Sequence, residues 1–208
     1  MRALRRAKQL FVRKPKPCLY WNDTHLKVSL PERLPGCHHD VLLHHIWATG
    51  QDKMRIVKTG LLTLLPDLQV FLDVDDMEDI GDFEGYVART SSHLVYCSKG
   101  FFDSKGAMRG LVAAVKQKKP IIALVNFDEN DGGQSLDAVK ASLVAADTKY
   151  DEWGFAGDTP TGAALYDAFF EHEPIEWQGV AMQPDMMRRI IERLVPDATD
   201  KTYVCEKV

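Results

Sequence analysis

The feature that most constrains this chain is a regular alternation of short apolar runs with longer amphipathic segments. Apolar runs of about four to eight residues are typical of strands buried on both faces, whereas apolar residues at every third or fourth position are typical of helices. The expected strands are 40–46, 68–72, 93–97, 120–125 and 174–177, and the expected helices are 51–65, 83–88, 104–116, 136–146, 165–170 and 184–194. This order predicts an α/β fold, a parallel sheet with helices on both faces.

Ligands of such sheets bind at the carboxyl ends of the strands. This rule directs attention to three loops, which follow the first three expected strands: 46–52, 73–82 and 98–104.

The chain is expected to divide into three parts. Residues 1–36 contain four prolines after Arg13 and are predicted to be a basic leader or linker, with a short strand near Leu26–Leu30. Residues 37–195 form the main domain, in which 126–183 is an extended insertion. Residues 196–208 are expected to be a tail.

Charge is distributed unevenly along the chain. The first sixteen residues carry seven basic side chains and no acid, while the rest has a net charge of −11. An acidic domain argues against nucleic acid as the partner. The basic segment has three readings that the sequence leaves open: an amphipathic contact with an anionic membrane, a transit peptide, or a solvated tail.

The sequence also bears on the compartment. The four cysteines are scattered without C-x-x-C spacing, which is typical of a reducing compartment, and no apolar run is long enough to cross a membrane. We therefore expect a cytoplasmic protein.

Several motifs, taken in order, resemble a Toll/interleukin-1 receptor (TIR) domain, in particular the TIR-like domains of protists and algae. They are His39-Asp-Val-Leu-Leu, Trp47-Ala-Thr-Gly-Gln-Asp, Val70-Phe-Leu-Asp-Val-Asp-Asp, Leu94-Val-Tyr-Cys-Ser and Phe101-Phe-Asp-Ser. The resemblance implies a flavodoxin-like, five-stranded parallel sheet of order 2-1-3-4-5. TIR domains either assemble with one another in signalling or cleave NAD⁺ at the nicotinamide–ribose bond.

The enzymatic members of this family use a glutamate in the helix after the third strand. The family pattern Ser-x-x-Cys-x-x-Glu-Leu matches Ser104-Lys-Gly-Ala-Met-Arg-Gly110-Leu111, so Gly110 stands at the glutamate position. Residues 104–119 contain no acid that could replace it. No catalytic residue is therefore expected to be intact.

The loop after the second strand resembles the family loop that covers the nucleotide and mediates assembly. Its assembly candidates are Asp75, Asp76, Met77, Glu78, Asp79 and Ile80. Calcium is not expected there, because Ile80 and Val87 occupy positions where a calcium loop needs oxygen ligands.

Nucleotide contacts are expected from side chains that follow the first three strands: Trp47, Thr49, Gln51, Asp73, Ser98 and Ser104. Trp47 either stacks on a base or packs beneath its loop as part of the core. Ser104 also has a structural reading, as a helix cap. The cluster of Cys37, His38, His39, His44 and His45 predicts no metal site, because neighbouring strand residues point to opposite faces.

The sequence thus predicts a TIR-type assembly module that needs no cofactor and associates with other TIR domains or with itself. Two alternatives stay open. One is an NAD⁺ glycohydrolase that takes its carboxylate from elsewhere, with NAD⁺ as substrate. The other is a nucleotide-binding sensor.

Overall fold

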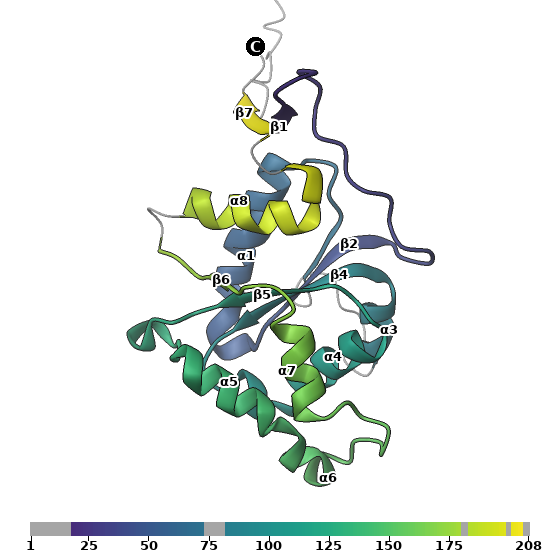
Figure 1. Ribbon diagram of the computed structural model, residues 1–208, viewed down its shortest axis with the longest axis vertical. Helices are drawn as coiled ribbons and strands as arrows, with labels where there is room; N and C mark the ends of the chain where they lie inside the picture. The colour runs from purple at the N-terminus through teal and green to yellow at the C-terminus, as the bar shows by residue number, and fades with distance from the viewer. Residues whose placement is uncertain (1–17, 73–81, 180–182, 199–200, 206–208) are drawn as a thin grey trace, which may run out of the picture.

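The centre of the molecule is a five-stranded parallel sheet, seen in a computed structural model that describes residues 18–72, 82–179, 183–198 and 201–205 (Figure 1). Its strand order is β3-β2-β4-β5-β6, which is 2-1-3-4-5 along the chain, so the predicted flavodoxin-like sheet is confirmed. The strands are β2 (His39–His44), β3 (Val70–Leu72), β4 (Thr90–Cys97), β5 (Ile121–Val125) and β6 (Ile175–Glu176).

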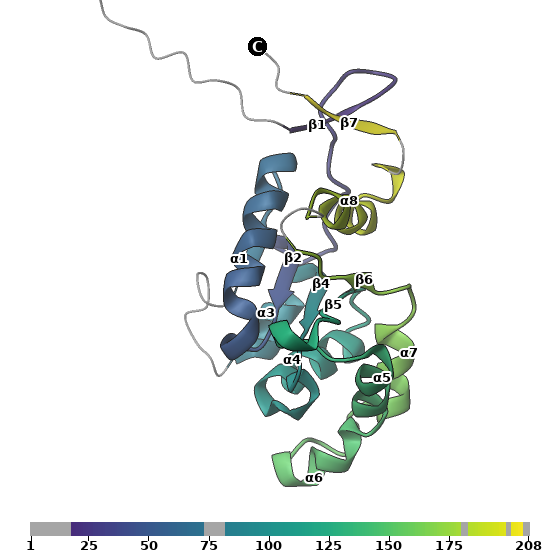
Figure 2. The ribbon, with the colours of Figure 1, turned by 90° about the vertical axis from the view of Figure 1, so that its left-hand side faces the viewer.

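Helices cover both faces of this sheet, as predicted (Figures 1 and 2). One face packs against α1 (Trp47–Leu64) and α8 (Gln183–Leu194). The other face packs against α3 (Phe83–Ala88), α4 (Lys105–Lys116), α5 (Leu136–Val144) and α7 (Gly162–Phe169).

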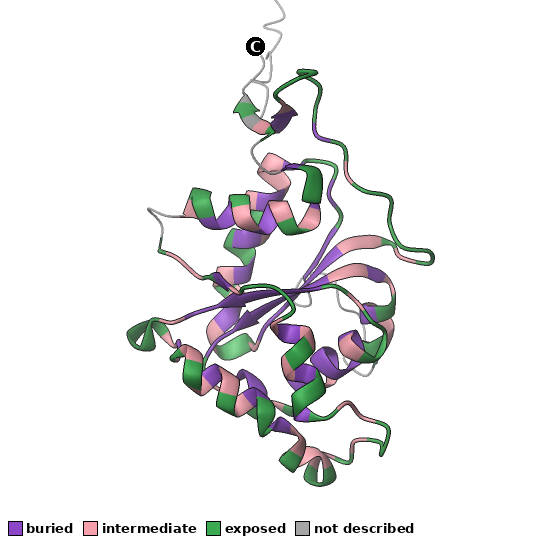
Figure 3. Cartoon of the chain, viewed as in Figure 1, coloured by how far each residue is buried: buried purple, intermediate pink, exposed green. Residues whose placement is uncertain are grey.

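Alternation along the strands explains why both layers are needed. In β2, Val41 and Leu43 join the core beneath α1 and α8, while Leu42 joins the core beneath α3 and α4. These three side chains are fully buried, and the strands carry the most continuous burial in the molecule (Figure 3). A strand buried on both faces must be apolar at successive positions, which is the pattern in the sequence.

Some boundaries differ from those predicted. Helix α1 begins at Trp47, four residues before the predicted start. The first turn escaped prediction because Ala48, Thr49 and Gly50 show no apolar periodicity. The segment 150–162, where no helix was expected, contains the short helix α6 (Tyr150–Trp153). Short 3₁₀ turns occupy Phe101–Asp103, Glu129–Asp131, Ala146–Lys149 and Pro196–Ala198.

The strand predicted near Leu26–Leu30 was wrong. Only Lys27 in that stretch makes a bridge, opposite Tyr20, and the strand lies earlier, at Cys18–Trp21 (β1). Strand β1 pairs antiparallel with β7 (Thr202–Cys205), so the leader and the tail form a two-stranded ribbon beside α8 (Figure 2). A pairing between segments so far apart in the sequence leaves no local signal in either.

None of the helices in the described ranges combines the length and the apolar character needed to cross a bilayer.

Candidate functional site

The carboxyl ends of the central strands bring two of the predicted nucleotide-binding residues together. Thr49, in the first turn of α1, and Ser98, directly after β4, share a hydrogen bond of 2.6 Å between their hydroxyl oxygens. Ser98 is fully buried. The two hydroxyl groups therefore join the loops that follow β2 and β4.

The loop after β5 folds over the same edge. Asn126 is fully buried, and its side chain donates to the carbonyl of Asp131 (2.9 Å) and accepts from the backbone N–H of Asp128 (3.0 Å). The backbone N–H of Lys99 donates to the carbonyl of Gly132 (2.9 Å). These bonds hold residues 126–133 against the loop after β4.

An ion pair fastens this loop to α1. The ammonium of Lys53 lies 2.8 Å from a carboxylate oxygen of Asp131 and donates to the carbonyl of the same residue (3.0 Å). Partial burial alone would lower the pKa of Lys53, but its interactions with Asp131 and Tyr96 outweigh that effect and raise it. Lys53 therefore stays charged at neutral pH.

Trp47 is exposed over 57% of its surface, at the first position of α1. The alternative in which Trp47 packs beneath its loop as core is wrong. The other alternative, in which the ring stacks on a base, stays a prediction. Gln51 is half-buried one turn further along α1.

Ser104 caps α4, as one of its two readings predicted. Its extended backbone precedes the helix, and its hydroxyl accepts a hydrogen bond from the backbone N–H of Ala107 (3.3 Å). The cap accounts for this serine without a ligand.

The position expected to hold the family glutamate lies on the buried side of α4. A β-carbon at Gly110 would lie 2.2 Å from Cε1 of Phe83 and 2.7 Å from Cε1 of His44, both too close for any side chain. Phe83 opens α3, and His44 ends β2. Two aromatic rings thus fill the space next to Gly110.

His44 is held in place by a second buried histidine. Its Nδ1 lies 2.9 Å from Nε2 of His93 on the neighbouring strand β4, and its ring packs edge-on against Phe101. Burial, and to a lesser extent the charge of Lys119, lowers the pKa of His93 to about 3. Burial is also the main cause that lowers the pKa of His44 well below its usual value, with further lowering by His93 and His45. Both rings are neutral at neutral pH, so one donates its N–H to the other.

The assembly candidates Asp75, Asp76, Met77, Glu78, Asp79 and Ile80 and the nucleotide candidate Asp73 lie outside the described residues. Their roles stay predictions.

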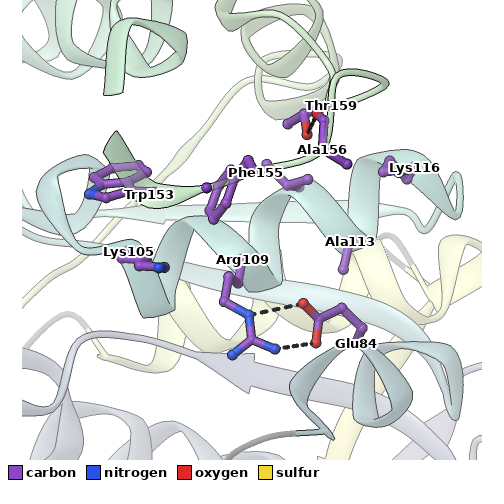
Figure 4. Close-up of a pocket in the computed structure, with 11 residues that line it drawn as sticks. Glu84, Lys105, Arg109, Ala113, Lys116, Trp153, Phe155, Ala156 and Thr159 are labelled. Carbon is purple, nitrogen blue, oxygen red and sulfur yellow. Dashed lines mark hydrogen bonds and ion pairs between the residues drawn. The ribbon is translucent and has the colours of Figure 1, made fainter. Parts of the chain in front are cut away.

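The sequence reasoning missed a cleft of about 420 Å³ on the other side of α4 (Figure 4). Three cations of α4 line it: Lys105, Arg109 and Lys116. Two aromatic residues face them, Trp153 at the end of α6 and Phe155 just after it. The available signal was the stretch 104–119, which has no acid and places these cations at helical spacing. In the sequence alone, this stretch indicates only that no acid near Gly110 can replace the catalytic glutamate.

Comparison with known proteins supports the fold. No family model and no curated protein matches the sequence. Among solved structures, the chain is similar to the TIR domains of the activated Roq1 resistosome that directly recognises the pathogen effector XopQ, with a TM-score of 0.52 and 12% identity over 74% of this chain and 98% of that chain. It also overlaps a diflavin flavoprotein A3 from Nostoc sp., with a TM-score of 0.35 and 9% identity over 76% of this chain and 97% of that one. The first likeness supports a TIR-like fold, and the second is too limited to support an inference.

Proposed function

We propose that this chain is a TIR-type signalling module that acts by associating with other TIR domains or with copies of itself, without hydrolysing NAD⁺. One observation carries the proposal: Gly110 offers no carboxylate, and the space beside it is occupied by Phe83 and His44. A glutamate lost to a small residue would leave a gap into which a ligand or another acid could reach. Here the gap is filled.

The electrostatics around Gly110 argue in the same direction. Cleavage of the nicotinamide–ribose bond develops positive charge on the ribose, which a nearby carboxylate would stabilise by a few kcal/mol. The side chains beside Gly110 are a phenyl ring and a buried histidine that is neutral at neutral pH. Neither supplies negative charge.

Support for association comes from the fold and from the sequence. The similar TIR domains belong to a resistosome, which is an assembly. Residues 73–82 contain six acids in ten residues, whereas α4 contains none. We infer that the loop, including Met77 and Ile80, forms the contact.

The catalytic half of the proposal is tested by incubating the purified chain with NAD⁺ and measuring nicotinamide release across a range of protein concentrations. No release above the level of the heat-treated protein is expected. Turnover that persists through repurification and dilution would overturn this half. Loss of that turnover in Asp75→Asn or Asp76→Asn would then establish the glycohydrolase alternative.

The association half is tested by sedimentation velocity at increasing concentration, for the chain alone and mixed with other TIR domains. Ile80→Asp and a reversal of charge at Asp75 are expected to weaken the association. Asp67→Lys is the matched control, because Asp67 is an exposed acid in the turn after α1, outside the loop. A chain that stays monomeric at every concentration and with every TIR partner would contradict the proposal.

The exposed ring of Trp47 favours a second function, a nucleotide sensor at the Thr49–Ser98 edge. A ligand that binds the folded state at about 100 times its dissociation constant stabilises it by about 2.7 kcal/mol. Thermal unfolding with NAD⁺ or ADP-ribose should then shift upward in the wild type but not in Trp47→Ala. Absence of any shift at millimolar ligand would exclude this function.

A further inference from the structure

The cleft over α4 has the composition of a binding site and lies apart from the Thr49–Ser98 edge. It has a volume of about 420 Å³, within the range of pockets that take small molecules. Its floor is α4, and its opposite wall is the segment 153–159 (Figure 4). None of the residues at the Thr49–Ser98 edge lines it.

The cations of the floor form one stripe. Lys105, Arg109 and Lys116 are separated by four and seven residues, close to one and two turns, so they share one face of α4. The cleft is therefore elongated along the helix axis, with a lysine at each end and the guanidinium group between them (Figure 4). Glu84 is the only acidic side chain among the described residues that line it.

Acidic neighbours already engage two of these cations. Arg109 makes a two-point ion pair with Glu84, with N–O distances of 2.9 and 2.6 Å. Lys116 lies 2.7 Å from Asp158, a residue outside the cleft lining. Within the described part of the chain, Lys105 has no ion-pair partner, so the end of the cleft at Lys105 carries uncompensated positive charge.

The aromatic wall is fixed in place before any ligand arrives. The hydroxyl group of Tyr150 donates to the carbonyl of Pro160 (3.0 Å), and the backbone N–H of Phe155 donates to the carbonyl of Tyr150 (3.0 Å). Gly154 ends α6 in the left-handed conformation, with φ +69°, which reverses the chain between Trp153 and Phe155. The two rings then lie 5.5 Å apart. A preformed wall reduces the ordering cost of binding.

We propose that this cleft binds a small aromatic phosphate, a planar ring joined to a phosphate group as in a nucleoside monophosphate. The ring packs against Phe155 and Trp153, and the phosphate pairs with Lys105. A neutral aromatic compound would leave the charge of Lys105 uncompensated, and inorganic phosphate would leave the aromatic wall uncovered. Both halves of the ligand are therefore needed. This inference goes beyond the association function and does not depend on it.

The test is isothermal titration of the full chain with adenosine monophosphate, adenosine and inorganic phosphate. The monophosphate is expected to bind at least about tenfold more tightly than either half alone. Lys105→Ala and Phe155→Leu should each weaken its binding by about tenfold, and Lys105→Arg should retain it, because the charge is kept.

Two controls make the result decisive. Lys27→Ala removes an exposed lysine that bridges to Tyr20 of β1, and β1 lies at the opposite end of the molecule from α6 (Figure 2), so the affinity should stay unchanged. Trp47→Leu tells the two sites apart, because Trp47 belongs to the edge that the sensor function would use. Loss of binding in Trp47→Leu but not in Lys105→Ala would place the ligand at the Thr49–Ser98 edge and overturn the inference. Absence of binding at millimolar ligand, or binding that Lys105→Ala and Phe155→Leu do not affect, would overturn it as well.

Discussion

The two faces of α4 differ sharply in packing and in charge. The face toward the sheet has small or apolar residues and approaches its neighbours so closely that Gly110 leaves no room for a β-carbon. The opposite face carries three cations and borders an open cleft (Figure 4). One helix thus closes the position where the family resemblance places its chemistry and opens a different surface.

This difference teaches that a missing catalytic residue can have two structural meanings. A side chain can be lost while its pocket survives, or the pocket can be rebuilt around the smaller residue. The proposed function corresponds to the second case, because Phe83 and His44, which is paired with His93, fill the space next to Gly110. Each prediction below either breaks or sharpens the contrast between the closed face and the open one.

The largest effect is expected from Gly110→Glu. A carboxylate forced between Phe83 and His44 is both too large for the space and buried without a partner, so we expect a loss of about 3 kcal/mol or more in the free energy of unfolding. Urea denaturation measures it. No NAD⁺ cleavage should appear. A stably folded variant that releases nicotinamide would show that the pocket survives and would break the comparison.

Acid should also destabilise the fold through the buried histidines at the closed face of α4. His93 has a pKa of about 3 in the folded state, against about 6.5 in an unfolded chain, and His44 is lowered in the same direction. The unfolded state therefore binds more protons as pH falls from about 6.5 toward 3, and stability is lost over that window. The slope should approach about 1.4 kcal/mol per pH unit for His93 alone.

Thermal unfolding between pH 7 and pH 4 measures this slope, and His93→Gln is the comparison variant. It removes the titrating ring while keeping a polar side chain, so its stability should depend less on pH than that of the wild type. Equal slopes in the two proteins would show that other groups control the acid response.

What the sequence could predict here was local or periodic. The strands were recognisable because burial on both faces requires successive apolar residues, and the Ser104 cap because a hydroxyl directly before a helix has few other roles. The strand order came from the family resemblance. Thr49 and Ser98 were expected near each other because both follow the carboxyl ends of strands that are neighbours in the sheet.

What could not be predicted depends on contacts between distant segments. Nothing in residues 104–119 indicates that Phe83 lies against Gly110, and nothing near Phe155 indicates that it faces Arg109. The burial of Trp47 was undecidable for the same reason, since a tryptophan after a strand suits core and surface equally. Such contacts follow from how helices pack, which local patterns do not encode.

A smaller effect, opposite in sign, is expected from Gly106→Ala in the exposed first turn of the same helix. A β-carbon at Gly106 would meet only the hydroxyl oxygen of Ser104, at 4.0 Å. The substitution should stabilise the chain by about 0.5–1 kcal/mol, because alanine loses less backbone entropy than glycine on forming a helix. Gly110→Ala is the matched control and should instead destabilise by about 1–3 kcal/mol through overpacking. Equal shifts in the two melting temperatures would show that the closed face packs no more tightly than the exposed first turn.

The smallest effect concerns the ion pair of Glu84 with Arg109, which ties α3 to α4 at the edge of the cleft (Figure 4). Both side chains are partly exposed, so solvent screens the pair, and a double-mutant cycle with Glu84→Gln and Arg109→Met should give a coupling of about 0.2–1 kcal/mol. Partial burial would raise the pKa of Glu84, but its hydrogen bonds and the charge of Arg109 outweigh that effect and lower it. The coupling is therefore present above the unfolded pKa of about 4.3 and lost as pH falls below it. A coupling that stayed constant down to pH 3 would show that the two residues interact through packing. The open face of α4 would then be ordered by packing contacts and not by the ion pair.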